Sequence, residues 1–421
     1  MDGITKLYSN IPDNIWWRGI FVFLVIIMIT YFSIAIHYSM VQGQFNTSPS
    51  SVAQLLSIRN STLSAAIDPL KPVYTSVCAK LASNSGAYAG IMSGGNAALA
   101  NWRPLTVRLA GYLGGNVGQA RDGVFDMVKG INYALVQGAR AFVLEIDYLN
   151  VAPCVPVVIY RDAAAYMRSI NTGSIQVACD TIAKKAFSNN NYDPVIIMVY
   201  FRRVPGGAQQ KSYYLTNTAK ALAPLTPYFL TSANGTNFNN CANETQLFIN
   251  PITDYQKKII VLTNYDTPTL PTTSNPTDNL NFWTNARIYQ DDANYTSELG
   301  SVTPIKPAGT TPAAVIGSTN QYINTPSSGL ATQTTKAVNT FVISMAPLAY
   351  TYTATLLNTL LNTLGIQSVP LDVVNLSTSA EHANTLAGRT EPVALQNLSM
   401  ASNINDPLSF WSNAGYSKKT S

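Results

Sequence analysis

The chain has 421 residues, of which 47% are hydrophobic and only 11% are charged, and its formal net charge is +5. So large an apolar share with so few charges excludes a disordered polyelectrolyte and is sufficient for a sizeable core. The basic residues are scattered and form no dense stripe that would read a phosphate backbone, so we expect no nucleic-acid partner.

The first predicted element is a transmembrane helix. An uncharged apolar run extends from Gly19 to Ile36, and about 18 to 20 residues of helix cross a hydrocarbon core of about 30 Å. We therefore predict a tail over residues 1–14 and a signal-anchor helix over residues 15–40, with the lipid bilayer as partner. The proposed anchor residues are Trp16, Trp17, Arg18, Ile20, Phe21, Phe23, Leu24, Ile26, Ile27 and Ile36.

Two alternatives to a retained anchor stay open: a cleaved signal peptide and a buried core helix. Signal peptides have apolar cores of about 7 to 15 residues that end at small residues. Here the run is longer and ends in bulky residues, which favours retention. Arg18 precedes the run, and no Lys or Arg follows it until Arg59. This asymmetry predicts a single-pass protein with a cytosolic, or equivalent, N-terminus and an exported body.

The four cysteines Cys78, Cys154, Cys179 and Cys241 contain no CxxC pair, which disfavours a zinc site. They are compatible with two disulfides or with buried thiols. Sequons for N-glycosylation, a modification of exported chains, occur at seven positions. They begin at Asn46, Asn60, Asn234, Asn243, Asn294, Asn375 and Asn397.

After a predicted stalk over residues 41–96, with a helix at 52–67, strand-like and helix-like segments alternate. This alternation predicts an α/β fold with a mainly parallel sheet. Between residues 267 and 335 the pattern dissolves, so we predict an irregular insertion or lid there, and a C-terminal tail over 377–421. The predicted strands are 141–146, 155–159, 194–201, 258–263, 340–344 and 369–374, and the predicted helices are 126–137, 181–187, 220–223 and 352–364.

Several segments, in a shared order, resemble the catalytic X domain of phosphatidylinositol-specific phospholipase C. They are Gly111-Tyr112-Leu113-Gly114-Gly115, the run from Ile131 to Arg140, Leu144-Glu145-Ile146-Asp147, residues 156–160, 193–197 and 257–261, and the run from Gly365 to Leu371. The resemblance implies a distorted TIM-type (β/α) barrel over residues 97–376, with the site at the carboxyl ends of the strands.

The resemblance also implies a chemistry that needs two histidines and calcium-binding acids. The chain has two histidines, His37 and His382, and neither lies at a family position. The first catalytic histidine aligns near Leu109 or Ala110, and the second falls on Tyr160. Glu145 and Asp147 match calcium acids, whereas a later acid falls on Tyr200 or Phe201. We therefore expect no catalytic residues, no enzyme and no cofactor, with Ca²⁺ the one metal that the resemblance suggests.

Glu145 and Asp147 lie two apart on a strand, so they face the same side. They would bind a cation, form an acid–base pair, or be neutralised by Arg140, Arg161 or another base. Arg202-Arg203 would hold an anion or form a solvated strand end. The aromatic pairs Phe282-Trp283 and Phe410-Trp411 are either partner anchors or packing residues.

The resulting functional prediction is a non-catalytic, membrane-anchored, phospholipase C-like barrel with a structural role. Its most concrete form is a minor capsid protein that links the internal membrane of a large DNA virus to the capsid shell. Two alternatives remain: an exported, membrane-bound phosphodiesterase or glycan hydrolase that uses Glu145 and Asp147, and a surface receptor or adhesin that displays residues 267–335.

Overall fold

A computed structural model describes the parts of the chain considered below. They are residues 15–42, 52–53, 56–57, 76–83, 97–113, 123–161, 167, 169–188, 190–291, 302–346, 352–371, 411 and 415–419. Most of the predicted helix at 52–67 lies outside these residues, and so does His382.

Seven parallel strands form the central sheet. Single parallel bridges, Ile343 to Ser368 and Val107 to Leu371, then place residues 368–371 between the last strand and the first. The chain therefore has the predicted α/β architecture of a TIM-type barrel. In sheet order the strands are β2 (Thr106–Arg108), β5 (Ala141–Asp147), β7 (Val195–Phe201), β10 (Ile259–Thr263), β11 (Ala286–Gln290), β12 (Ala314–Ser318) and β13 (Phe341–Met345).

The strands form where apolar runs can be buried on both faces. Every residue of β5 and β7 is buried, as expected for parallel strands covered by helices. Alternate residues separate into two cores: Phe142 and Leu144 pack toward the helices, whereas Ala141 and Val143 belong to the cluster inside the barrel. This alternation decides which side chains reach the barrel interior.

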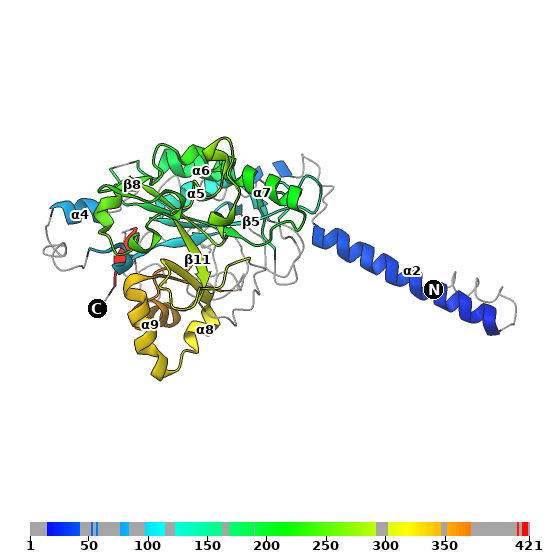
Figure 1. Cartoon of the computed structure of the whole chain (residues 1–421). Coiled ribbons are helices and arrows are strands. Elements are labelled where there is room, and N and C mark those ends of the chain that lie inside the picture. The colour runs from blue at the N-terminus through cyan, green and yellow to red at the C-terminus, as the bar shows by residue number, and fades with distance from the viewer. Residues whose placement is uncertain are drawn as a thin grey trace.

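Helices surround the outer face of the barrel. Helices α5 (Met127–Val136), α6 (Ile175–Lys185) and α7 (Ala208–Ala221) lie on one side of the barrel, whereas α8 (Thr319–Ile323) and α9 (Ser327–Asn339) lie on the other (Figure 1). Residues of α5 to α9 share one core cluster with the outward-facing strand residues. Asp126 and Ser174 cap α5 and α6 by accepting from the backbone N–H groups of Lys129 and Val177. Helix α10 (Ala354–Asn358) continues as a π-helical turn, Thr359–Thr363, before Gly365 at φ 68°.

Shorter elements complete the body. The strands are β1 (Trp102–Pro104), β3 (Tyr112–Leu113), β4 (Val124–Phe125), β6 (Val157–Val158), β8 (Ser232–Ala233), β9 (Thr236–Asn237) and β14 (Tyr416–Lys418). The 3-10 turns are η2 (Leu99–Asn101), η3 (Ala223–Leu225), η4 (Asn239–Cys241), η5 (Glu244–Gln246), η6 (Ile252–Tyr255), η7 (Thr267–Thr269) and η8 (Pro276–Asp278).

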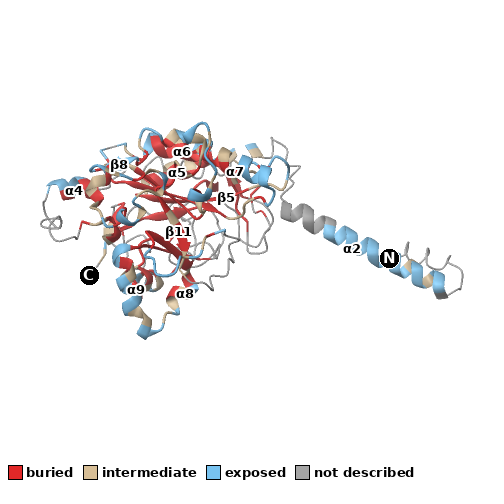
Figure 2. Cartoon of the chain, in the orientation of Figure 1, coloured by how far each residue is buried: buried red, intermediate tan, exposed pale blue. Residues whose placement is uncertain are grey.

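Helix α2 (Ile15–Gln42) projects away from the body (Figure 1). Its segment Trp16–Ile34 is long and apolar enough to cross a membrane, and none of it is buried inside the structure. Figure 2 shows the contrast between this exposed helix and the buried strands of the barrel. Trp16 and Phe23 are 77% and 63% exposed, so the apolar surface of residues 16–34 is not used in the packing of the body.

The prediction that residues 267–335 form an irregular insertion or lid is wrong. This segment contains two barrel strands, β11 and β12, the helix α8 and the first part of α9. Each of these strands is five residues long, and polar residues flank both, so their apolar signal is too short to stand out. A strand was also predicted over residues 369–374. In the part of it that the structure describes, residues 369–371, Leu371 forms a single bridge to Val107 and no continuous strand is present.

The boundaries of the stalk and the tail also differ from the prediction. Helix α4 (Val77–Ser83) lies in the predicted stalk, yet Val77, Cys78 and Leu81 are buried in the barrel core cluster. Its first turn is fixed by Asp193, which accepts from the backbone N–H groups of Val77 and Cys78. In the predicted tail, β14 pairs antiparallel with β1. Distant partners hold both segments on the body, which a local pattern does not reveal.

Candidate functional site at the barrel mouth

Strand β5 delivers two acidic side chains to the interior of the barrel at its carboxyl end. Glu145 and Asp147 continue the alternation of Ala141 and Val143, which lie in the inner core, and both are 1% exposed. Carboxylates so fully buried require charged or hydrogen-bonding partners. The identity of these partners decides what the site can do.

Two arginines hold Glu145. Arg108, at the end of β2, donates through Nε to Oε1 of Glu145 at 2.8 Å, and its Nη2 forms an ion pair with the same oxygen at 2.7 Å. Arg202, directly after β7, donates through Nη1 at 3.1 Å to Oε2. Arg108 also donates through Nη1 to the carbonyl oxygen of Ala346 at 2.8 Å. These contacts join the ends of β2, β5, β7 and β13.

A second pair of arginines holds Asp147. Arg203 donates through Nε to Oδ1 at 2.7 Å, and Arg161 donates through Nε to Oδ2, also at 2.7 Å. The Arg203 guanidinium lies 4.5 Å from the ring centroid of Tyr148 and donates to the carbonyl oxygen of Tyr148 at 2.8 Å. Burial raises the pKa of the Tyr148 hydroxyl, and the positive charge of the nearby Arg203 offsets part of this rise.

The structure brings together the predicted pair Glu145 and Asp147 and neutralises them with arginines, one of the three predicted roles. Arg161 is a neutralising base as predicted, but Arg140 is not: it donates to the carbonyl oxygen of Ala186. The solvated strand end expected for Arg202-Arg203 is wrong, because the Arg202 side chain is only 11% exposed and both arginines form ion pairs. Arg108 was missed, since β2 is only three residues long.

The carboxylates do not fit a calcium site. Ca²⁺ takes about six to eight oxygen ligands at about 2.3 to 2.6 Å. All four oxygens of Glu145 and Asp147 instead accept hydrogen bonds from guanidinium groups. The residues described contain no group of three or more His, Cys, Asp or Glu side chains with the geometry to hold a metal. A cation placed here would also face the four positive charges of the arginines.

The positions aligned with family residues have different environments. Leu109 is buried at φ 52°, and Tyr160 packs edge-on against Tyr112 with ring centroids 4.7 Å apart. Tyr200 lies in the inner core, where it pairs in register with Glu145. Its hydroxyl is buried and has no hydrogen-bond partner in the described part of the chain. Of these three residues, Tyr200 is the one that pairs in register with Glu145.

The four arginines and two carboxylates, which we call the mouth cluster, carry an excess of two positive charges. Nε and Nη2 of Arg202 have no acceptor among the described residues. Guanidinium groups with free donors bind carboxylates and phosphates in preference to cations. The chemistry of the mouth cluster is therefore that of an anion site.

The four cysteines, Asn234, Asn243, Trp283 and Trp411 are not among the residues of the mouth cluster. None of the four cysteines forms a disulfide, and burial raises the pKa of the Cys241 thiol to about 12. Asn234 and Asn243 are exposed and have positive φ values, whereas Asn46, Asn60, Asn294, Asn375 and Asn397 lie outside the described residues. Trp283 and Trp411 are buried and donate to backbone carbonyls, so they pack onto the body.

Comparison with known proteins gave matches by structure only. No protein-family model and no curated protein matched the sequence. The phospholipase C PLC21 of L. pealei is 12% identical with a TM-score of 0.46, over 77% of this chain and 37% of that one. PLC21 of S. officinalis is 12% identical with a TM-score of 0.44, over 66% and 34%. This chain thus spans little more than a third of their length.

A third similar structure is a calcium-dependent, phosphoinositol-specific phospholipase C from Pseudomonas sp. It is 9% identical with a TM-score of 0.37, over 66% of this chain and 90% of that one. The expectation that this chain is not an enzyme is contradicted by these findings, because the similar solved structures are phospholipase C enzymes.

Proposed function

We propose that the chain is a single-pass membrane protein in which α2 tethers the barrel to a bilayer. A helix that is apolar all round belongs in a protein core or in a membrane. The segment Trp16–Ile34 has no buried residue within the structure, so the core is not its environment. Trp16 and Trp17 lie at one end of the segment, where aromatic rings suit the membrane–water interface.

The experiment is extraction of membranes from cells that express the full chain. The protein is expected to stay in the membrane pellet at alkaline pH with residues 1–42 still attached, as read by mass spectrometry. The double variant Leu24→Arg/Ile27→Arg places two charges at the centre of the segment, each at an insertion cost of about 2.5 to 3.5 kcal/mol. It should move to the soluble fraction, whereas the matched control Leu24→Val/Ile27→Val should not. Cleavage after the apolar run would refute the tether.

The tether acquires a specific role if the barrel bridges a membrane and a protein shell. We propose that the source is a large DNA virus and that the barrel links its internal membrane to the capsid. The low proportion of charged residues suits a body packed between two layers. Crosslinking mass spectrometry of purified virions should join exposed lysines of the barrel to capsid proteins. Absence of the chain from virions, or a cellular source, would overturn this role.

The mouth cluster supports a second candidate function, which is binding of a phosphate-bearing ligand without calcium. The observation that favours it is the excess of two positive charges around Glu145 and Asp147. The unpartnered Tyr200 hydroxyl adds a donor beside them. Such an anion would compensate for the cost of holding guanidinium groups out of water.

Phosphate binding is measured by calorimetry with inorganic phosphate and with an inositol phosphate, each with and without a chelator. Arg202→Gln should weaken binding about tenfold, or ~1.4 kcal/mol, and the chelator should have no effect. Lys184→Gln, which removes an exposed charge on α6, is the matched control. Loss of binding on chelation, or unchanged binding by Arg202→Gln, would contradict this function.

A further inference from the structure

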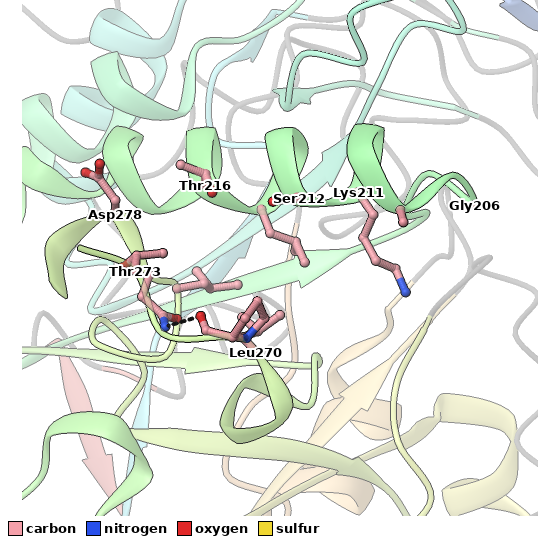
Figure 3. A pocket seen from close by; sticks show the side chains of 12 residues that line it. Gly206, Lys211, Ser212, Thr216, Leu270, Thr273 and Asp278 are labelled. Atoms are coloured by element: carbon pink, nitrogen blue, oxygen red, sulfur yellow. Dashed lines mark hydrogen bonds between the residues drawn. The ribbon is translucent and has the colours of Figure 1, made fainter. Parts of the chain in front are cut away.

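A cavity of 280 Å³ lies outside the barrel, between α7 and residues 270–280. These two segments follow β7 and β10, so the cavity is on the flank of the body and shares no lining residue with the mouth cluster. Figure 3 shows α7 along one side, with Lys211 toward one end and Asp278 toward the other. Its volume is just below the range of about 300 to 1,000 Å³ usual for small-molecule pockets.

The floor and one wall of this pocket are apolar. Leu215 on α7 is 4% exposed and Leu280 is 1% exposed, and Leu270 and Pro271 close the other side. Since Leu215 and Leu280 belong to the core between sheet and helices, the floor is rigid. Such a floor contacts an aliphatic or flat apolar group and makes no hydrogen bond to it.

The polar groups on the two sides of the rim differ in whether they already have partners. On the side of residues 270–280, Asp278 pairs with Lys220 at 3.5 Å, and Asn279 donates to the carbonyl oxygen of Pro271 and accepts from the N–H of Asn281. On the α7 side, the Lys211 ammonium and the Ser212 and Thr216 hydroxyls make no hydrogen bond with other described residues. The donors that remain available are therefore on α7, together with a positive charge.

We propose that this pocket binds an anionic amphiphile, a single aliphatic chain that ends in a carboxylate or a phosphate. The chain lies over Leu215, Leu270 and Leu280, and the anionic end is held by Lys211, with Ser212 and Thr216 as further donors. The volume of about 280 Å³ accommodates one aliphatic chain. The site does not depend on the mouth cluster, although the proposed tether would place it near a supply of such amphiphiles.

The test uses the full chain in lipid nanodiscs and photoactivatable probes. A decanoate carrying a diazirine is compared with the matching alcohol and the matching alkyl phosphate, and the labelled peptides are located by mass spectrometry. We expect the two anions to label residues 206–216 and 270–280, and the alcohol to label them weakly. Stronger labelling by the phosphate identifies a lipid headgroup as the source of the anion, whereas stronger labelling by the carboxylate identifies a fatty acid.

Two variants on the exposed face of α7 give the decisive controls. Ser212→Trp fills the pocket and should lower labelling about tenfold, or ~1.4 kcal/mol, whereas Gln209→Trp adds the same ring outside it and should not. Lys211→Glu should reduce labelling by both anions. Equal labelling by the alcohol, or an unchanged pattern in Ser212→Trp, would overturn the proposal. Membrane extraction is measured separately, so failure of the pocket is distinct from failure of the tether.

Discussion

Arg108 and Glu145 join the first two strands of the barrel through one carboxylate oxygen, which accepts from Nε of Arg108 at 2.8 Å and forms an ion pair with Nη2 at 2.7 Å. The two side chains are 5% and 2% exposed. Arg202 approaches the other oxygen of Glu145 from β7. Glu145 therefore lies between two guanidinium groups and links three neighbouring strands.

Removing the Glu145 charge should destabilise the barrel strongly. Glu145→Gln leaves Arg108 and Arg202 facing each other without a counter-ion, and breaking a buried pair in this way costs about 3 to 5 kcal/mol. The measurement is the free energy of unfolding in denaturant. The double variant Glu145→Gln/Arg108→Met should recover part of the loss. Asp180→Asn, in an exposed pair with Lys184, should change stability by at most about 1 kcal/mol; an equal loss in both single variants would contradict the assignment.

The half of the mouth cluster that lies on β5 follows from the sequence. Residues 141–146 form a mainly apolar run of strand length, and a spacing of two places Glu145 and Asp147 on one face of the strand. The partners do not follow from it, because Arg108 and Arg202 are 37 and 57 residues away in the chain. Their proximity depends on the parallel register of three strands, and no local pattern encodes that register.

The fold, like the mouth cluster, was predictable from the sequence only where the signal is local. The long runs at β5 and β7 were predictable, since a strand buried on both faces is apolar throughout. Strands β11 and β12 were missed inside the polar region 267–335, because Arg287, Gln290, Gly317 and Ser318 dilute two segments of only five residues. The docking of β14 on β1 depends on contacts across more than 300 positions, which composition does not reveal.

Calcium should neither stabilise nor destabilise the folded chain. A site occupied at 100 times its dissociation constant would add about 2.7 kcal/mol of stability. Because both mouth carboxylates already accept from guanidinium groups, we expect the thermal midpoint to stay the same in calcium and in a chelator. Thermal unfolding in the two buffers measures this, with magnesium as the control cation. A rise in the thermal midpoint with calcium alone would show that the metal displaces the arginines from the carboxylates, and would contradict this prediction.

A methyl group at position 130 should disrupt the contact between α5 and the loop after β2. An ideal Cβ on Gly130 would lie 1.8 Å from the carbonyl oxygen of Ala110, so helix and loop must separate in Gly130→Ala. Overpacking of this kind costs about 1 to 3 kcal/mol or more. Gly206→Ala is the control, because nothing lies within 4 Å of the added carbon. Thermal unfolding should show a lower midpoint for Gly130→Ala alone; equal midpoints would contradict the close contact.

The docking of the C-terminal strand should depend on pH through Lys419. Burial lowers the pKa of Lys419 to about 7, and the charge of Arg103 adds to this shift. Its ammonium group donates to the carbonyl oxygen of Ala337 at 2.5 Å. Because the unfolded side chain has its ordinary pKa of 10.5, the unfolded state holds more protons between pH 7 and pH 10.5. Stability must therefore rise with pH across this window.

The slope contributed by one lysine is at most about 1.4 kcal/mol per pH unit, and partial exposure of Lys419 to solvent makes it smaller. Below about pH 7 both states are protonated and the slope vanishes. Lys419→Met should flatten the profile and make the chain more stable near pH 7, because no ammonium group then has to be buried beside Arg103. Lys418→Met, at the exposed neighbouring position, should keep the wild-type profile. Stability that falls from pH 7 to pH 10 in the wild type, or a profile of Lys419→Met identical to it, would show that Lys419 is not buried by β14.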